Sequence, residues 1–150
     1  MRRIRIPVVA GGVVAGLLLA TLGVSFRFLF PRDATLAGGQ LARNIDRRLI
    51  TPIDITRRFP RDASAIYVTA TVLHAPLGTK VRASLYELST DRSASSFELV
   101  TVGTRNIGFE FLPAPAGWSL GKYEMRLFLN GEEAERLPFD VVTETASSLR

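Results

Sequence analysis

The sequence contains no cysteine and only one histidine, His74. Without cysteine there is no disulfide, no thiolate metal site, no thiol nucleophile and no lipid-modified cysteine anchor. One histidine cannot supply a zinc site, and a Ser-His-Asp triad would have to use it although no G-x-S-x-G phrase is present. Calcium-loop and phosphate-loop patterns are also missing. We therefore expect a non-enzymatic protein with no catalytic residue, no cofactor and no metal.

Charge is missing from residues 6–26, IPVVAGGVVAGLLLATLGVSF. A helix of this length is roughly 30 Å long, the thickness of a bilayer's hydrocarbon core. A buried helix of a soluble domain is seldom apolar on every side over such a length. The apolar core of a cleaved signal peptide is shorter, about 7–15 residues, and Gly23-Val24-Ser25 is a mediocre cleavage site, so a retained anchor is favoured over cleavage. We predict a transmembrane helix with an aromatic collar over residues 6–30, after a basic tail at 1–5.

The predicted span carries a ladder of small residues, Gly12, Gly16 and Ala20, and Gly23 follows one heptad after Gly16. Small residues at this spacing let a second helix approach closely, because helices in lipid associate mainly through packing. Glycine is also common in transmembrane helices for other reasons. A helix-packing face and a simple compositional preference therefore both stay open.

Basic and aromatic residues flank the predicted span on both sides. They are Arg2, Arg3 and Arg5 before it, and Phe26, Arg27, Phe28 and Phe30 after it. The second group is typical of a membrane interface, where arginine snorkels among aromatic rings. The short charged tail resists translocation, although further arginines follow the span. We predict a single-pass inner (cytoplasmic) membrane protein with a cytoplasmic N-terminus and a periplasmic or extracellular C-terminal domain, in contact with the lipid bilayer.

The sequence pI of about 10.4 is typical of nucleic-acid binders, but the charge is unevenly distributed. Residues 1–50 carry eight Lys/Arg against two Asp/Glu, whereas residues 51–150 carry eleven against twelve. The excess positive charge therefore surrounds the predicted span, where it suits anionic headgroups. A nucleic-acid partner is disfavoured.

Residues 31–52 are predicted to connect the span to a domain. Within QLARNIDRRLI, Leu41, Ile45 and Leu49 follow one another at four-residue steps and form an apolar stripe. Thr51-Pro52 supplies a stop. The pattern predicts a short amphipathic helix. Such a helix can lie on the membrane or dock on a partner, or it can pack against the chain's own domain. Both alternatives stay open.

From residue 53 the apolar period changes to two, which is typical of strands. Ile53, Ile55 and Phe59 would alternate in a first strand, Asn130-Gly131 predicts a type I′ hairpin, and Pro138 predicts an edge strand. The pattern predicts about seven strands over residues 53–143, an all-β immunoglobulin-like antiparallel sandwich, and a tail at 144–150. The inward positions of the later strands are expected to be Ile66, Val68, Ala70, Val72, Val81, Ala83, Leu85, Ile107, Phe109, Phe111, Tyr123, Met125, Leu127, Leu129, Leu137, Phe139 and Val141.

Three phrases carry a resemblance to a known class of domain. They are GWSLGKY at 117–123, NG at 130–131 and LPFDV at 137–141. Together they resemble the closing hairpin of bacterial Ig-like modules, in which "gW-x-x-G-x-Y" enters the penultimate strand and "F-x-V" ends the domain. The run APLGTKV at 75–81 also fits their "a-x-x-G-T-x-V" turn. The resemblance covers about residues 55–142. It implies an extracytoplasmic, non-catalytic module, often on a membrane anchor, and carries over no functional residue.

Two features are candidate partner contacts. Arg57, Arg58 and Arg61 bracket Phe59-Pro60 near the expected membrane end of the domain. Guanidinium groups there suit lipid phosphates or an acidic partner, and a solvated loop is the plain alternative. Trp118 either anchors an interface or plugs the end of the sandwich.

The sequence thus predicts an accessory, structural subunit of a larger bacterial membrane complex of respiratory or photosynthetic type. Its span would pack against other membrane-protein subunits, and its sandwich would cover them. The alternative is a free-standing membrane-anchored module that binds a polysaccharide or a peptide.

Overall fold

A computed structural model describes residues 33–143 of the chain. The predicted transmembrane helix, its ladder of Gly12, Gly16, Ala20 and Gly23, its flanking arginines and phenylalanines, and the tail at 144–150 all lie outside these residues. Within residues 33–143, no helix has the length and hydropathy that a membrane span requires.

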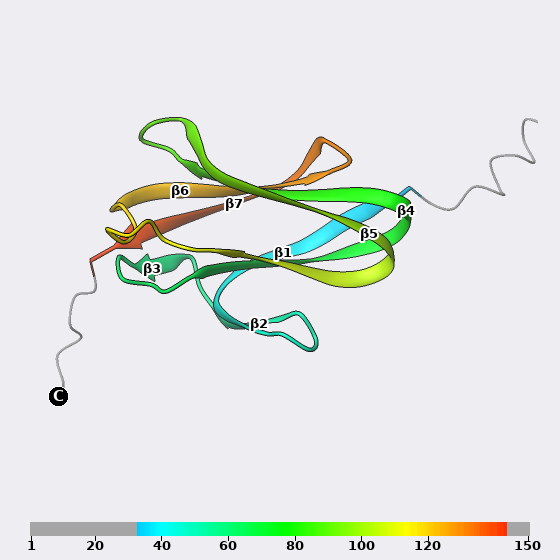
Figure 1. Cartoon of the computed structure of the whole chain (residues 1–150), viewed down its shortest axis with the longest axis horizontal. Helices are drawn as coiled ribbons and strands as arrows, with labels where there is room; N and C mark the ends of the chain where they lie inside the picture. Colours follow the sequence, from blue (N-terminus) through cyan, green and yellow to red (C-terminus); the bar gives the residue numbers. More distant parts are fainter. Residues whose placement is uncertain (1–32, 144–150) are drawn as a thin grey trace, which may run out of the picture. The chain divides into compact units, whose positions relative to one another are not determined.

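The described residues form seven strands and no helix (Figure 1), which confirms the all-β prediction for this part of the chain. The strands are β1 (Thr35–Asp46), β2 (Thr51–Ile55), β3 (Arg58–Pro60), β4 (Ile66–Glu87), β5 (Arg92–Phe111), β6 (Gly121–Leu129) and β7 (Glu132–Val142).

The long β4–β5 hairpin is the frame of the domain. The two strands pair antiparallel from Ile66 opposite Phe111 to Glu87 opposite Arg92. The first part of β4 also pairs with β1, and the last part pairs with β6. Between these parts the register shifts, and the hairpin curves round at the end of the molecule where β1 begins (Figure 1). We call this bend, residues 73–79 and 101–105, the corner.

The bent hairpin contributes to both layers of a sandwich. One layer consists of β2, β1, the first part of β4 and the last part of β5. The other consists of the first part of β5, the last part of β4, β6, β7 and β3, and β3 runs parallel to β7. The turn expected at residues 75–78 is therefore a bulge within one continuous strand and does not reverse the chain.

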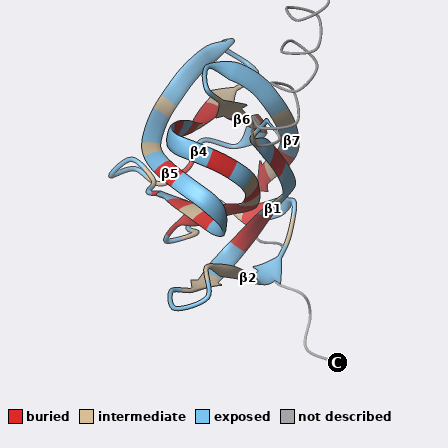
Figure 2. Cartoon of the chain, turned by 90° about the vertical axis from the view of Figure 1, so that its right-hand side faces the viewer, coloured by how far each residue is buried: buried red, intermediate tan, exposed pale blue. Residues whose placement is uncertain are grey.

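The core lies between the two layers and follows the predicted period-two pattern (Figure 2). All the inward positions predicted for the later strands are buried, except Leu129, which packs on the core while partly exposed. Phe59 is also fully buried, but the single first strand expected to hold Ile53, Ile55 and Phe59 is wrong, because β2 ends at Ile55 and Phe59 lies in the separate strand β3. Ile53 and Ile55 are exposed, because β2 is the outermost strand of its layer and β1 is the only strand that pairs with it among the described residues.

The amphipathic helix predicted within residues 31–52 is wrong. Residues 35–46 form β1, in which Leu41 is a core residue paired opposite Val68 and Ile45 is half-buried. Leu49 is exposed in the turn between β1 and β2. A four-residue step fits a strand as well as a helix, because positions two and four apart share one face of a strand. The compact unit consequently begins at Asp33, and the sandwich begins before residue 53.

The closing hairpin has the predicted turn. Asn130 and Gly131 have φ values of 50° and 89°, which a type I′ turn requires at both central positions. Pro138 lies in β7, whose outer neighbour β3 covers only Asp140 to Val142. The prediction that Pro138 marks an edge strand is wrong, because β3 lies outside β7. The proline is tolerated because it precedes the segment of β7 that pairs with β3, where no ladder donor is needed.

Candidate functional site

Trp118 closes one end of the sandwich. Its side chain is only 6% exposed, its Nε1 donates to the carbonyl of Ala63 at 2.9 Å, and its ring stands edge-on to Tyr123 with centroids 6.5 Å apart. The Tyr123 ring stacks on Phe139, and burial raises the pKa of its hydroxyl, which donates to the carbonyl of Ser119. These contacts favour the plug over the interface anchor for Trp118. The G-W-x-x-G-x-Y phrase is therefore a packing motif.

Gly117 is required where this plug meets the loop after β3. Its φ is +84°, and a Cβ there would lie 3.0 Å from the carbonyl oxygen of Arg61, which also accepts a hydrogen bond from the Trp118 amide. Gly117→Ala should therefore lower the free energy of unfolding by about 1–3 kcal/mol. Chemical denaturation measures this value. Gly103→Ala is the matched control, because Gly103 has a φ of +76° and open space around it. Equal losses in both variants would contradict the contact with Arg61.

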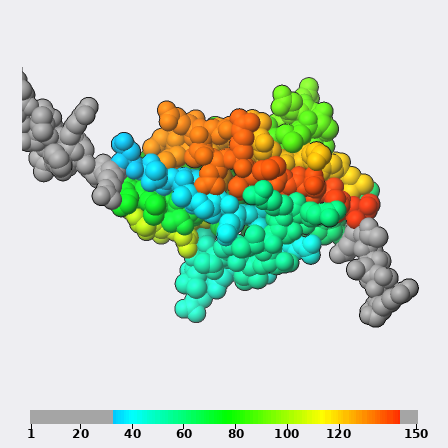
Figure 3. Space-filling view, turned by 180° about the vertical axis from the view of Figure 1, so that it is seen from behind, coloured from blue at the N-terminus to red at the C-terminus, as the bar shows by residue number. Residues whose placement is uncertain are grey.

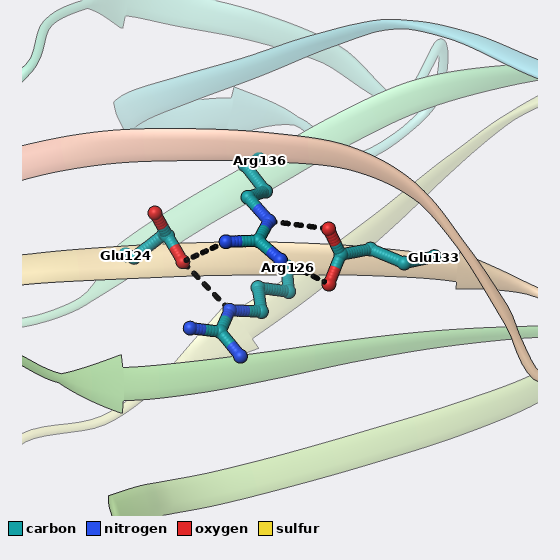
Figure 4. Close-up of polar contacts among 4 residues, drawn as sticks. All are labelled: Glu124, Arg126, Glu133 and Arg136. Atoms are coloured by element: carbon teal, nitrogen blue, oxygen red, sulfur yellow. Dashed lines mark hydrogen bonds and ion pairs between the residues drawn. The ribbon is translucent and has the colours of Figure 1, made fainter. Parts of the chain in front are cut away.

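The outer face of β6 and β7 carries a network of two arginines and two glutamates (Figure 4). Glu124 accepts a hydrogen bond from Arg126 Nε at 2.6 Å and lies 3.8 Å from Arg136 Nη1. Arg136 also pairs with Glu133 and lowers the pKa of that carboxyl. The Arg126 guanidinium lies 4.0 Å from the ring centroid of Tyr86. The two arginines and two glutamates of the network neutralise one another. The network therefore stabilises the sheet surface and leaves no net charge to attract a ligand.

A groove with excess positive charge lies beside β3. It has a volume of about 400 Å³ and is lined by Arg57, Arg58, Lys122, Asp140, Leu88, Tyr123, Pro138 and Phe139. Lys122 pairs with Asp140 at 3.6 Å, whereas neither arginine has an ion-pair partner among residues 33–143. The groove thus brings together two of the three predicted arginines. Arg61 lies apart, in a depression beside Gly117.

The position of these arginines differs from the prediction. Arg58 pairs opposite Asp140 near the end of β7, whereas the chain enters the domain beside the corner, where Thr35 pairs opposite Leu73. Figure 1 shows β3 and the beginning of β1 at opposite ends of the sandwich. The arginines therefore do not lie at the end through which residue 33 enters.

Sequence reasoning missed the free edge of β5. Among residues 33–143, β5 pairs with β4 and with no other strand, along its 20 residues. Phe97 is exposed on this edge and touches Phe111 edge-on, with centroids 5.1 Å apart. The first part of β5 is rich in serine and has no alternation of apolar residues, so only the strand pairing reveals the edge.

Among residues 33–143, side chains that could bind a metal ion are not gathered. The described part of the chain has no group of three or more His, Asp or Glu side chains placed to hold a metal ion. His74 is exposed at the corner with a φ of 54°, and its amide donates to Thr104 Oγ1 at 3.1 Å.

Comparison with known proteins finds a match only in structure. No protein-family model and no curated protein sequence matches the chain. An immunoglobulin-like protein from Pseudomonas aeruginosa superposes with a TM-score of 0.51 at 13% identity, over 74% of this chain and 98% of that one. The chain has an immunoglobulin-like fold.

A second solved structure resembles this immunoglobulin-like domain more weakly. It is the alkylpurine DNA glycosylase AlkC of Pseudomonas fluorescens, bound to DNA containing an abasic site analogue. The TM-score is 0.46 at 16% identity, and the match spans 72% of this chain but only 30% of the glycosylase. The first likeness concerns the fold alone, and neither assigns a ligand.

Proposed function

We propose that this protein is a non-catalytic, single-pass membrane protein that acts as an accessory subunit of a larger bacterial membrane complex. The uncharged run at residues 6–26 would anchor it, and the immunoglobulin-like domain would bind a partner subunit outside the cytoplasm. The observation that carries the proposal is the free edge of β5.

An unpaired strand edge presents a row of backbone N–H and C=O groups to any approaching strand. Natural domains usually blunt such an edge with short strands, lysines, prolines or a covering element. β5 has 20 residues, contains neither lysine nor proline, and exposes Phe97 beside its serine-rich first part. A partner strand added to this edge would gain main-chain hydrogen bonds and an aromatic contact.

Charge on the edge should weaken the complex. The double variant Ser93→Lys, Ala94→Lys places lysines at two exposed edge positions and should reduce partner co-purification about tenfold, equivalent to about 1.4 kcal/mol of binding free energy. Quantitative mass spectrometry after purification in mild detergent measures this ratio. Ser89→Lys, Thr90→Lys is the matched control, because it adds the same charge at the tip that joins β4 to β5. Equal recovery from both variants would count against the edge.

A second candidate function rests on the groove of Arg57 and Arg58. Two arginines without ion-pair partners in the described chain, beside Lys122 and Tyr123, suit an acidic extended ligand. A free-standing surface module that binds an anionic polysaccharide or peptide would use this groove. The double variant Arg57→Ser, Arg58→Ser leaves the β5 edge intact. Loss of binding to the anionic polysaccharide or peptide in this variant would favour the second function.

A further inference from the structure

Three aliphatic side chains are exposed at or next to the corner of the β4–β5 hairpin: Leu77 and Val102 lie in the corner, and Val100 directly precedes its β5 part. Leu77 is 88% exposed, Val100 63% and Val102 49%. Ala75 pairs opposite Gly103, and Thr79 pairs opposite Thr101. Val102 is therefore the β5 residue that faces the bulge at Pro76-Leu77-Gly78. Val100 pairs opposite Lys80, one step further along. We call these three side chains the corner patch.

The corner patch lies at the end of the domain where the chain enters. Thr35 pairs opposite Leu73, the first residue of the corner. Figure 3 shows the green and yellow-green atoms of β4 and β5 gathered next to the blue beginning of β1. Only residues 27–32 separate the uncharged run from Asp33, and six residues reach at most about 20 Å. A membrane that holds residues 6–26 would therefore lie close to this end of the domain.

The charges around the patch suit a lipid surface with anionic headgroups. Lys80 pairs with Glu98 at 3.8 Å, so this pair adds no net charge. Arg105, opposite Val72 at the rim of the corner, is exposed and has no ion-pair partner among the described residues. Exposed aliphatic side chains beside a cation are the combination that interfacial membrane-binding surfaces use.

We propose that the corner patch contacts the bilayer, with Leu77 inserted at the level of the acyl-chain boundary and Arg105 among the headgroups. This inference rests on the proposed membrane anchor. It gives the domain a fixed orientation: the patch faces the lipid, and the groove of Arg57 and Arg58 points away from the membrane.

The absence of cysteine from the native chain allows a direct test. The full-length variant Leu77→Cys would be labelled with an environment-sensitive fluorophore and reconstituted into vesicles of neutral and anionic phospholipid. Thr90→Cys is the matched control, since Thr90 is exposed at the tip between β4 and β5, far along the hairpin from the corner. Vesicle flotation of the same samples measures anchoring independently.

The expected result is a blue-shifted emission at position 77 and several-fold stronger quenching by a lipid-borne quencher than at position 90. If the chain floats with the vesicles but the lipid-borne quencher acts equally at positions 77 and 90, the lipid contact is overturned and the anchor is left intact. Failure of the chain to float would overturn the anchor and the lipid contact together.

Discussion

Replacing Phe59 with alanine is expected to lower the free energy of unfolding by about 3–5 kcal/mol. Phe59 is the one buried side chain of the three-residue strand β3, and it has no exposed surface. Its ring stands edge-on to Phe139 with centroids 5.5 Å apart, and Phe139 in turn stacks on Tyr123. The alanine leaves a cavity at the point where β3 closes the layer against β7.

Chemical denaturation followed by circular dichroism measures this loss. Leu112→Ala is a suitable control, because Leu112 is exposed and should change the free energy of unfolding by about 0.5 kcal/mol or less. A loss at Phe59 no larger than the loss at Leu112 would contradict the position of β3 in the core.

Removal of residues 1–32 is expected to transfer the protein from the membrane fraction to the aqueous fraction. Those residues contain the uncharged run, and the compact unit begins at Asp33. The 21 uncharged positions of residues 6–26 supply far more membrane affinity than three residues of a corner patch can. Fractionation of cells followed by alkaline extraction measures the distribution.

The matched control for this truncation keeps the apolar run and replaces Arg2, Arg3 and Arg5 with serine. It should remain in the membrane fraction, although its orientation is then less strongly determined. A truncated chain that stays with membranes after alkaline extraction would contradict residues 6–26 as the anchor.

The later strands could be predicted from the sequence because their apolar residues alternate without interruption. Runs such as Ile66 to Val72 and Ile107 to Phe111 have one periodicity only, and the structure buries their inward positions as expected. The Asn130-Gly131 turn was predictable for a different reason, since few other residue pairs accept two positive φ values. Local chemistry determined these features.

The remaining features depend on tertiary pairing, which a local pattern does not contain. Leu41 and Ile45 fit a helix and a strand equally well by spacing, and the pairing of Leu41 with β4 and of Ile45 with β2 decides the outcome. The bulge at Pro76 to Gly78 looks like a chain reversal in sequence, but both flanking segments stay paired with β5. The free β5 edge and the corner patch follow from that pairing, so neither could be predicted.

The groove of Arg57 and Arg58 illustrates the same limit. The sequence places these arginines early in the domain, which suggested proximity to the membrane. The parallel pairing of β3 with β7 instead places them beside the last residues of the final strand. Sequence order and spatial order diverge wherever a strand pairs with a distant segment.

The central claim is that the protein is an accessory subunit of a membrane complex. Its most direct test is to purify the full-length chain in mild detergent and to identify the co-purifying proteins by mass spectrometry. The account predicts a small set of membrane subunits recovered in constant ratio to this chain. Recovery of the chain alone would contradict it.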